Sequence, residues 1–272
     1  MKKLNKALVI VPALICLLAA VVQTQTLRAS NGKNAGEQHD PNKQTKTLPL
    51  DSLDGLEVQS IREDGVDPVK TKADIVAYRG RRALRVVNED GLTATGTPAG
   101  AQAIAIVRAS DFRDGTIEAD VVGLPREGAP QTTRGFVGIA FRVQEHGSRY
   151  ESIYLRMTNA RAADQVQRNH STQYVSQPDF TWQRLRKENP SAYESYVDLE
   201  PGAWTRVKIV VAGSTASLYV NGADQPCLIV NDLKLGEAHG QVALWTGSNT
   251  EAYSSNLTVG SRGTPNITES SK

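Results

Sequence analysis

Residues 204–222 read WTRVKIVVAGSTASLYVNG, and this stretch decides the predicted fold. Apolar and polar side chains alternate from Thr205 to Val211, a pattern that is typical of a strand with one buried face. A second apolar run, Ser217 to Val220, leads into Asn221-Gly222, a pair that tolerates positive φ at two successive positions, as a tight reversal requires. The chain from Trp204 to Val230 is therefore predicted to form consecutive antiparallel strands.

The same period of two recurs along the chain, most clearly at Thr116 to Val121 and at Tyr150 to Arg156. Turn residues separate the apolar runs, and no long stretch has the helical period. Ten or more short strands divided by turns predict an all-β fold, a two-sheet antiparallel jelly-roll sandwich. The further predicted strands are Asp74 to Tyr78, Ala83 to Val87, Ala103 to Val107, Phe136 to Val143, Cys227 to Val230, Gln241 to Trp245 and Ala252 to Val259.

One long insertion, Met157 to Pro201, interrupts this rhythm. It is too long for a hairpin loop, and loops of such length are usually functional. Five of the 15 aromatic residues lie in it, namely Tyr174, Phe180, Trp182, Tyr193 and Tyr196. These rings could stack on a ligand, or they could pin the insertion to the sandwich. Residues 182–188 could also form one exposed, charged turn of helix.

The first 29 residues are predicted to be a removable export signal. Lys2, Lys3 and Lys6 precede an apolar stretch, residues 7–22, which is shorter than the roughly 20 residues that a membrane span needs. We expect a mature protein that starts near Ser30, is periplasmic or extracellular, and has no membrane association after cleavage. The predicted organisation is a flexible polar linker over residues 30–47, a folded domain over 48–260 and a polar tail over 261–272.

Charge and cysteine content exclude several classes of protein. The chain has 31 basic and 29 acidic residues, but four of the basic ones lie in the predicted signal, so the mature charge is slightly negative. A nucleic-acid binder is therefore not expected. Cys227 is the one cysteine after the signal, which rules out an internal disulfide and a cysteine-based zinc site. We expect this thiol to be free and mostly buried, and we expect Trp204 and Trp245 in the core.

Three stretches resemble a known superfamily. Residues 111–119, DFRDGTIEA, resemble the F-x-D-G-x-I-E strand of concanavalin A-like lectin/glucanase domains. Residues 204–222 are similar to the W-x-x-V-K-I…L-Y-V-N-G hairpin of laminin-G-like domains, and residues 240–257 to the ending of 3-keto-disaccharide hydrolase-like domains. The resemblance covers about residues 50–259. It implies a jelly roll whose curved sheet often binds glycans, although lectins, hydrolases, lyases and adhesion modules share this fold.

The residues argue against one type of catalysis. Laminarinase-type members of the superfamily carry E-x-D-x-x-E on one strand, and here Glu118 and Asp120 are followed by Gly123 in place of the third carboxylate. No G-x-S-x-G motif and no histidine pair at metal spacing occurs. No metal or other cofactor is expected. The resemblance leaves calcium open, since laminin-G-like relatives bind it through oxygen ligands, but no Asp-rich loop is present.

A sugar site needs aromatic faces with planar hydrogen-bonding groups around them. Tyr154 and Arg156 are two residues apart on one predicted strand, so they share a face, while Ile153 and Leu155 point toward the core. On the preceding strand the small residues Gly138 and Ala140 would leave room beside them. We expect the insertion to wall this floor, with Arg156 offering its guanidinium to the ligand. The predicted ligand-binding residues are Arg142, Tyr154, Arg156, Asn159, Arg161, Gln173, Tyr174, Trp182 and Arg186.

Three functions therefore stay open. The first is an exported carbohydrate-binding domain with a glycan as its partner. The second is a glycan-processing enzyme, a keto-glycoside hydrolase or a lyase, with no catalytic residues assigned. The third is a structural envelope or adhesion domain. A convergent acid and base about 5–10 Å apart would favour the hydrolase. An aromatic cleft without such a pair would favour the binding domain, and a flat, packed sheet face would favour the structural role.

Overall fold

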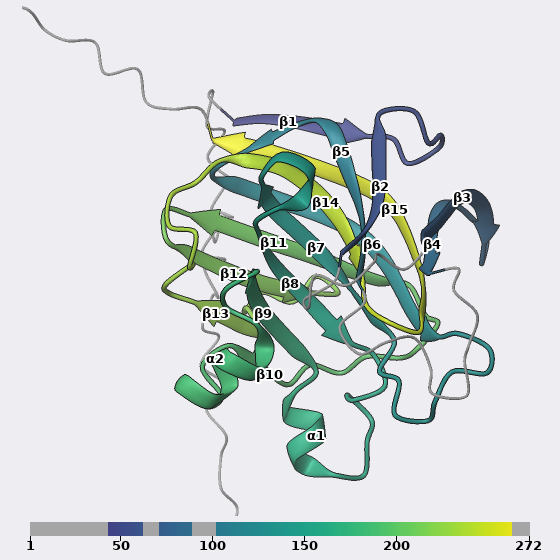
Figure 1. Ribbon diagram of the computed structural model, residues 1–272, viewed down its shortest axis with the longest axis vertical. Coiled ribbons are helices and arrows are strands. Elements are labelled where there is room, and N and C mark those ends of the chain that lie inside the picture. The colour runs from purple at the N-terminus through teal and green to yellow at the C-terminus, as the bar shows by residue number, and fades with distance from the viewer. Residues whose placement is uncertain (1–42, 62–70, 89–101, 263–272) are drawn as a thin grey trace, which may run out of the picture. The chain divides into compact units, whose positions relative to one another are not determined.

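Two antiparallel sheets form a sandwich (Figure 1). The structure is a computed structural model, and it describes residues 43–61, 71–88 and 102–262. Sheet A consists, in spatial order, of β13 (Leu228–Val230), β12 (Thr215–Val220), β11 (Thr205–Ala212), β6 (Gly115–Pro125), β15 (Thr250–Arg262), β4 (Arg81–Asn88) and β3 (Thr71–Tyr78), and β1 (Lys43–Leu48) also pairs with β15. The predicted all-β jelly-roll sandwich is confirmed.

Sheet B carries the strands on which the predicted site was placed. In spatial order it consists of β10 (Glu194–Ser195), β9 (Thr172–Gln177), β8 (Tyr150–Arg156), β7 (Phe136–Val143), β14 (Gly240–Thr246), β5 (Gln102–Phe112) and β2 (Leu56–Ile61). Three short helical segments interrupt the strands, namely η1 (Glu145–Gly147), α1 (Gln165–Asn169) and α2 (Trp182–Glu188).

The core between the sheets follows from the alternation of side chains. On β11, Val207, Ile209 and Val211 are buried, whereas Lys208 between them is exposed. Ile153 and Leu155 of β8 join the same apolar cluster from the other sheet, as predicted. Burial of such side chains contributes about 1.5–3 kcal/mol each, which makes this cluster the main source of stability.

Two smaller apolar clusters lie outside this core. One covers the outer face of sheet B and contains Tyr150, Tyr154 and Trp245. The other lies on sheet A, where Trp204 packs edge-on against Tyr78 with ring centroids 5.9 Å apart. The expectation for Trp204 is therefore wrong, because this side chain is only half-buried on an outer face. Trp245 is buried, but in the outer cluster and not between the sheets.

The insertion extends sheet B and does not simply lie over it. β9 pairs with β8, and the two-residue β10 pairs with β9, so both strands continue the sheet. Figure 1 shows α1 and α2 beside these two strands. The alternative of a helix over residues 182–188 is confirmed by α2, whose first turn is capped by the Thr181 side chain and whose inner face buries Leu185.

The strands reach beyond the predicted ends of the domain. β1 includes residues 43–47, which the sequence analysis placed in the flexible linker, and β15 continues to Arg262. Composition does not reveal β1, because its residues before Leu48 are polar and its backbone is satisfied by pairing with β15. The predicted signal and residues 30–42 lie outside the described residues, as do residues 263–272.

Three further observations concern the Cys227 thiol, possible metal ligands and membrane-spanning helices. Cys227 is a free cysteine, partly buried against the core, and burial raises the pKa of its thiol to about 11. Across the described ranges, no group of three or more His, Cys, Asp or Glu side chains could hold a metal ion. None of the helices in those ranges has the length and apolar character needed to cross a membrane.

Candidate functional site

The outer face of β7 and β8 forms the floor of the candidate site. In the antiparallel register, Phe136 lies opposite Arg156 and Gly138 lies opposite Tyr154, so the two predicted faces are side by side. Gly138 is required there, because an added Cβ would lie 2.5 Å from the Cβ of Tyr154. The Tyr154 ring stacks on Trp245 with centroids 4.4 Å apart. The floor is therefore a rigid aromatic surface.

A pocket of about 480 Å³ lies over this floor, within the size range of small-molecule sites. Its wall comes from the segment between Asn159 and Arg186, which the insertion supplies, and from residues just before β7. The pocket is lined by Thr132, Arg134, Phe136, Tyr154, Arg156, Asn159, Asp164, Val166, Gln167, His170, Trp182 and Arg186. Aromatic rings, guanidinium groups and amides thus converge on one volume.

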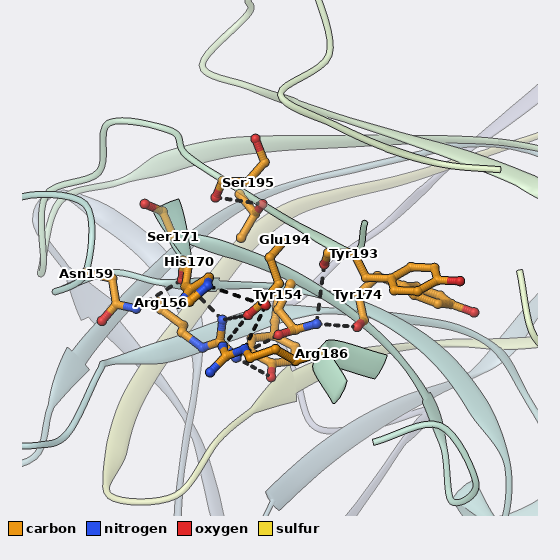
Figure 2. Close-up of polar contacts among 12 residues, drawn as sticks. Tyr154, Arg156, Asn159, His170, Ser171, Tyr174, Arg186, Tyr193, Glu194 and Ser195 are labelled. Atoms are coloured by element: carbon orange, nitrogen blue, oxygen red, sulfur yellow. Dashed lines mark hydrogen bonds and ion pairs between the residues drawn. The ribbon is translucent and has the colours of Figure 1, made fainter. Parts of the chain in front are cut away.

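Glu194 on β10 joins the floor to the wall. Its carboxylate accepts a hydrogen bond from Arg156 at 3.0 Å and another from Arg186 at 2.8 Å, and His170 Nε2 lies 3.6 Å away. Figure 2 shows both arginines converging on this carboxylate. We call these four residues the Glu194 cluster. Burial opposes ionisation of Glu194, but the hydrogen bond from Arg186 and the positive charge of Arg156 outweigh it and lower its pKa.

Arg156 is held on every side by protein groups. Its Nη1 also donates to the carbonyl of His170 at 3.2 Å, and its Nη2 donates to Gln173 Oε1 at 2.8 Å. The guanidinium carbon lies 5.4 Å from the Tyr154 ring centre. The residue is 5% exposed. These donors hold the pocket together, and the expectation that Arg156 also contacts a ligand stays a prediction.

His170 and Asn159 form the end of the pocket next to α1. Asn159 donates to the carbonyl of His170 at 3.0 Å and accepts from Gln167 at 3.2 Å. Burial and the charges of Arg186 and Arg156 lower the pKa of His170, and Glu194 only partly offsets them. This histidine is accordingly neutral at pH 7 and adds no positive charge to the pocket.

Trp182 and Arg186 form the wall on the α2 side. Residues four apart on a helix share a face, and here the Arg186 guanidinium lies 4.7 Å from the Trp182 ring centre. Trp182 is half-buried, so part of its ring remains accessible in the pocket. This geometry follows from the Thr181 cap, which fixes the start of α2 at Trp182.

Five of the nine predicted residues line the pocket, namely Tyr154, Arg156, Asn159, Trp182 and Arg186. Gln173 lies behind them as a buried partner of Arg156. Tyr174 does not reach the pocket, because the register places it opposite Ile153, on the core face, where its hydroxyl donates to Glu151. Arg161 does not reach it either, since its exposed side chain pairs with Asp198 at 3.1 Å.

Arg142 is also absent from the pocket, for a reason in the backbone. The pairing of β7 with β14 shifts register between Gln241 and Ala243, and Arg142 has a positive φ of 53°. This bulge ends the alternation that would have placed Arg142 on the face of Phe136. The guanidinium is instead fully buried and donates to the carbonyl of Gly213 at 2.7 Å.

Several residues in the pocket lining or directly behind it were not predicted. Glu194 lies in a strand of two residues without any strand pattern, and Asp164 and Gln167 belong to the start of α1. Arg134 lies just before β7, and His170 was considered without being assigned to the site. Their places depend on the pairing of β8, β9 and β10, which local periodicity does not reveal.

The two carboxylates of the partial E-x-D-x-x-E motif lie on the other sheet. Glu118 pairs with Arg206 at 2.7 Å, and Asp120 pairs with Arg81 at 2.8 Å. At Gly123 an added Cβ would lie 2.5 Å from the carbonyl oxygen of Gly135, so this position has no room for a glutamate. The motif is therefore part of an ion-pair network on sheet A.

This architecture, with its pocket on an outer sheet face, defines a concanavalin A-like lectin/glucanase fold. No protein-family model and no curated protein matches the chain. Among solved structures, the exoplasmic/lumenal domain of VIP36 in its Ca²⁺/Man-bound form is similar, with a TM-score of 0.51 and 7% identity over 82% of this chain and 91% of that chain. The predicted superfamily resemblance is thus confirmed at the level of the fold.

Two bacterial structures are similar at lower scores. A Bacillus subtilis protein of unknown function with a galectin-like fold has a TM-score of 0.49 and 11% identity, over 80% of this chain and 96% of that chain. The carbohydrate-binding module CBM66 from Bacillus subtilis has a TM-score of 0.44 and 12% identity, over 71% of this chain and 96% of that chain.

Proposed function

We propose that this chain is an exported carbohydrate-binding protein and that the pocket above β7 and β8 holds the sugar. The observation that carries the proposal is the convergence of the Tyr154 and Trp182 rings with amide and guanidinium groups in one pocket of about 480 Å³. The apolar C–H face of a sugar ring fits an aromatic face, and its hydroxyls fit such planar donors and acceptors. The Man-bound state of the VIP36 domain, which shares the fold, supports the same class of ligand.

The pocket offers a stacking surface and hydrogen-bonding groups on different sides. Trp182 presents a half-exposed ring, and Val166 at the rim is 63% exposed. Gln167 uses one amide hydrogen on Asn159, which leaves its carbonyl oxygen to accept from a sugar hydroxyl. Tyr154 forms the floor beneath them. A ring that stacks on Trp182 would therefore meet polar groups along its edge.

The carboxylates of the pocket region favour binding over hydrolysis. Glycoside hydrolysis generally needs one carboxyl group as acid and a second as nucleophile or base. Glu194 is ionised and accepts hydrogen bonds from both Arg156 and Arg186. Asp164 caps α1, since its side chain accepts a hydrogen bond from the backbone N–H of Gln167 at 2.6 Å. Both carboxylates thus have structural partners in the described chain.

A glycan array with the exported protein tests this function. We expect binding to at least one glycan, and we expect Trp182→Ala to weaken it on the order of tenfold, as loss of an aromatic stacking contact implies. Trp204→Ala is the matched control, because Trp204 lies on the outer face of sheet A. Absence of binding to every glycan would refute the proposal. N-terminal sequencing of exported material tests export, and retention of Met1 would contradict it.

A further inference from the structure

Arg134 is a cation of the pocket lining for which the described residues supply no side-chain partner. Its side chain is half-buried and lines the pocket at the rim before β7. Within residues 43–61, 71–88 and 102–262, no hydrogen bond or ion pair reaches its guanidinium. Its backbone is nevertheless fixed, since its carbonyl oxygen accepts from the N–H of Thr158 at 3.1 Å. The described residues thus leave a partly desolvated guanidinium at the pocket.

The fixed charges of the pocket leave a positive surplus. Arg156 and Arg186 share the single carboxylate of Glu194. Glu194 lies behind the lining, Asp164 is the acidic residue within it, and Arg134 is the third guanidinium. Three positive groups therefore accompany two negative ones in and directly behind the lining. His170 does not change this balance at pH 7, because it is neutral there.

We infer that the glycan bound in this pocket is acidic and that its anionic group pairs with Arg134. This inference rests on the proposed carbohydrate-binding function and specifies the class of sugar. A guanidinium presents two parallel N–H donors that match the oxygens of a carboxylate, and such charge-assisted pairs are stronger than neutral hydrogen bonds. A uronic-acid carboxylate and a sulfate ester share this chemistry. Among the described residues nothing pairs with the Arg134 guanidinium, which leaves it available to the anionic group, whereas Arg156 and Arg186 are already held by Glu194.

Calorimetric titration of the exported protein with matched sugars tests this inference. The carboxylate probes are oligomers of galacturonate, glucuronate and mannuronate, each paired with its neutral methyl ester, and the sulfate probes are sulfated galactose oligomers. We expect one acidic probe to bind at least tenfold more tightly than its neutral counterpart. Comparison of the carboxylate probes with the sulfate probes then shows whether the bound charge is a carboxylate or a sulfate ester.

Substitution of Arg134 identifies the residue responsible. Arg134→Gln should weaken binding of the acidic probe about 10–100-fold, the effect of one charge-assisted hydrogen-bonded pair, and should weaken binding of the neutral counterpart much less. Arg134→Lys should recover part of the affinity, because it keeps the charge and loses the fork. Arg161→Gln is the control, since it removes the same charge outside the pocket. The melting temperature should be unchanged in Arg134→Gln.

The outcomes separate this inference from the proposed function. Equal affinity for acidic and neutral probes, or an Arg134→Gln protein that binds the acidic probe like the wild type, would overturn the inference and leave carbohydrate binding intact. Failure of every acidic and neutral glycan to bind would overturn both.

Discussion

Arg156→Ala should destabilise the protein strongly, although this residue lines the proposed sugar pocket. The substitution removes a buried guanidinium that donates to Glu194 at 3.0 Å, to Gln173 at 2.8 Å and to the carbonyl of His170 at 3.2 Å. The Glu194 side chain is 2% exposed, so its charge is compensated by protein partners and not by bulk water.

The expected loss follows from these partners. Breaking a buried ion pair by removing one side typically costs about 3–5 kcal/mol. Arg186 continues to pair with Glu194 and reduces this loss, whereas Gln173 Oε1 loses its donor, which costs about 1–3 kcal/mol. The carbonyl of His170 keeps its bond from Asn159. We therefore expect the free energy of unfolding to fall by about 3–5 kcal/mol.

Urea unfolding followed by tryptophan fluorescence measures this change, with the slope checked so that the midpoint reports stability. Arg161→Ala is the control, because its exposed pairs with Asp198 and Glu200 are screened by water and should leave the midpoint nearly unchanged. An Arg156→Ala midpoint equal to the wild type would refute the reasoning, since it would show that the Glu194 cluster does not stabilise the fold.

Three further predictions concern Gly138 in the pocket floor, the loss of stability at acid pH through Glu194, and the Cys227 thiol. Gly138→Ala should lower the free energy of unfolding by about 1–3 kcal/mol and weaken glycan binding, because its Cβ would displace Tyr154; unchanged stability in urea would contradict this. The pKa of Glu194 is lowered below its ordinary value of 4.5, so the stability from its ionised form is complete above that pH and lost as the pH falls through the folded pKa. Between pH 6 and pH 3 the free energy of unfolding should therefore fall less steeply in Glu194→Gln than in the wild type. The same pH dependence in both proteins would count against a stabilising role of the Glu194 cluster. Cys227, whose thiol has a pKa of about 11, should react with iodoacetamide far more slowly at pH 8 in the native protein than in urea, and equal rates would show that it is accessible.

The strands and the floor of the site were predictable from the sequence, because both depend on local alternation. The predicted ranges Phe136 to Val143 and Tyr150 to Arg156 coincide with β7 and β8. Their polar-aromatic faces meet because the two strands are adjacent, and a small residue at Gly138 is visible in the sequence. The alternation of side chains is a property of each strand alone, so it can be recognised in the sequence without knowing which strand pairs with it.

The residues that were placed wrongly depend on register or on a bulge. Tyr174 and Gln173 are neighbours on β9, and only its pairing with β8 decides that Gln173 faces the site and Tyr174 the core. A shift by one residue exchanges the two faces of a strand. Arg142 lies at a bulge that has no signature in its own residue type. Glu194 is brought to Arg156 by the pairing of β10 with β9, which no local pattern predicts.

The Glu194 cluster also constrains how this pocket could change during evolution. Arg156, Arg186 and Glu194 connect β8, α2 and β10, so replacement of any one of them disturbs the fold before it alters specificity. Arg134 and Val166 lie at the rim and carry no such connection within the described chain. Proteins descended from a common ancestor with this chain could therefore exchange rim residues freely and acquire preferences for different sugars, while the ion cluster beneath them stays the same.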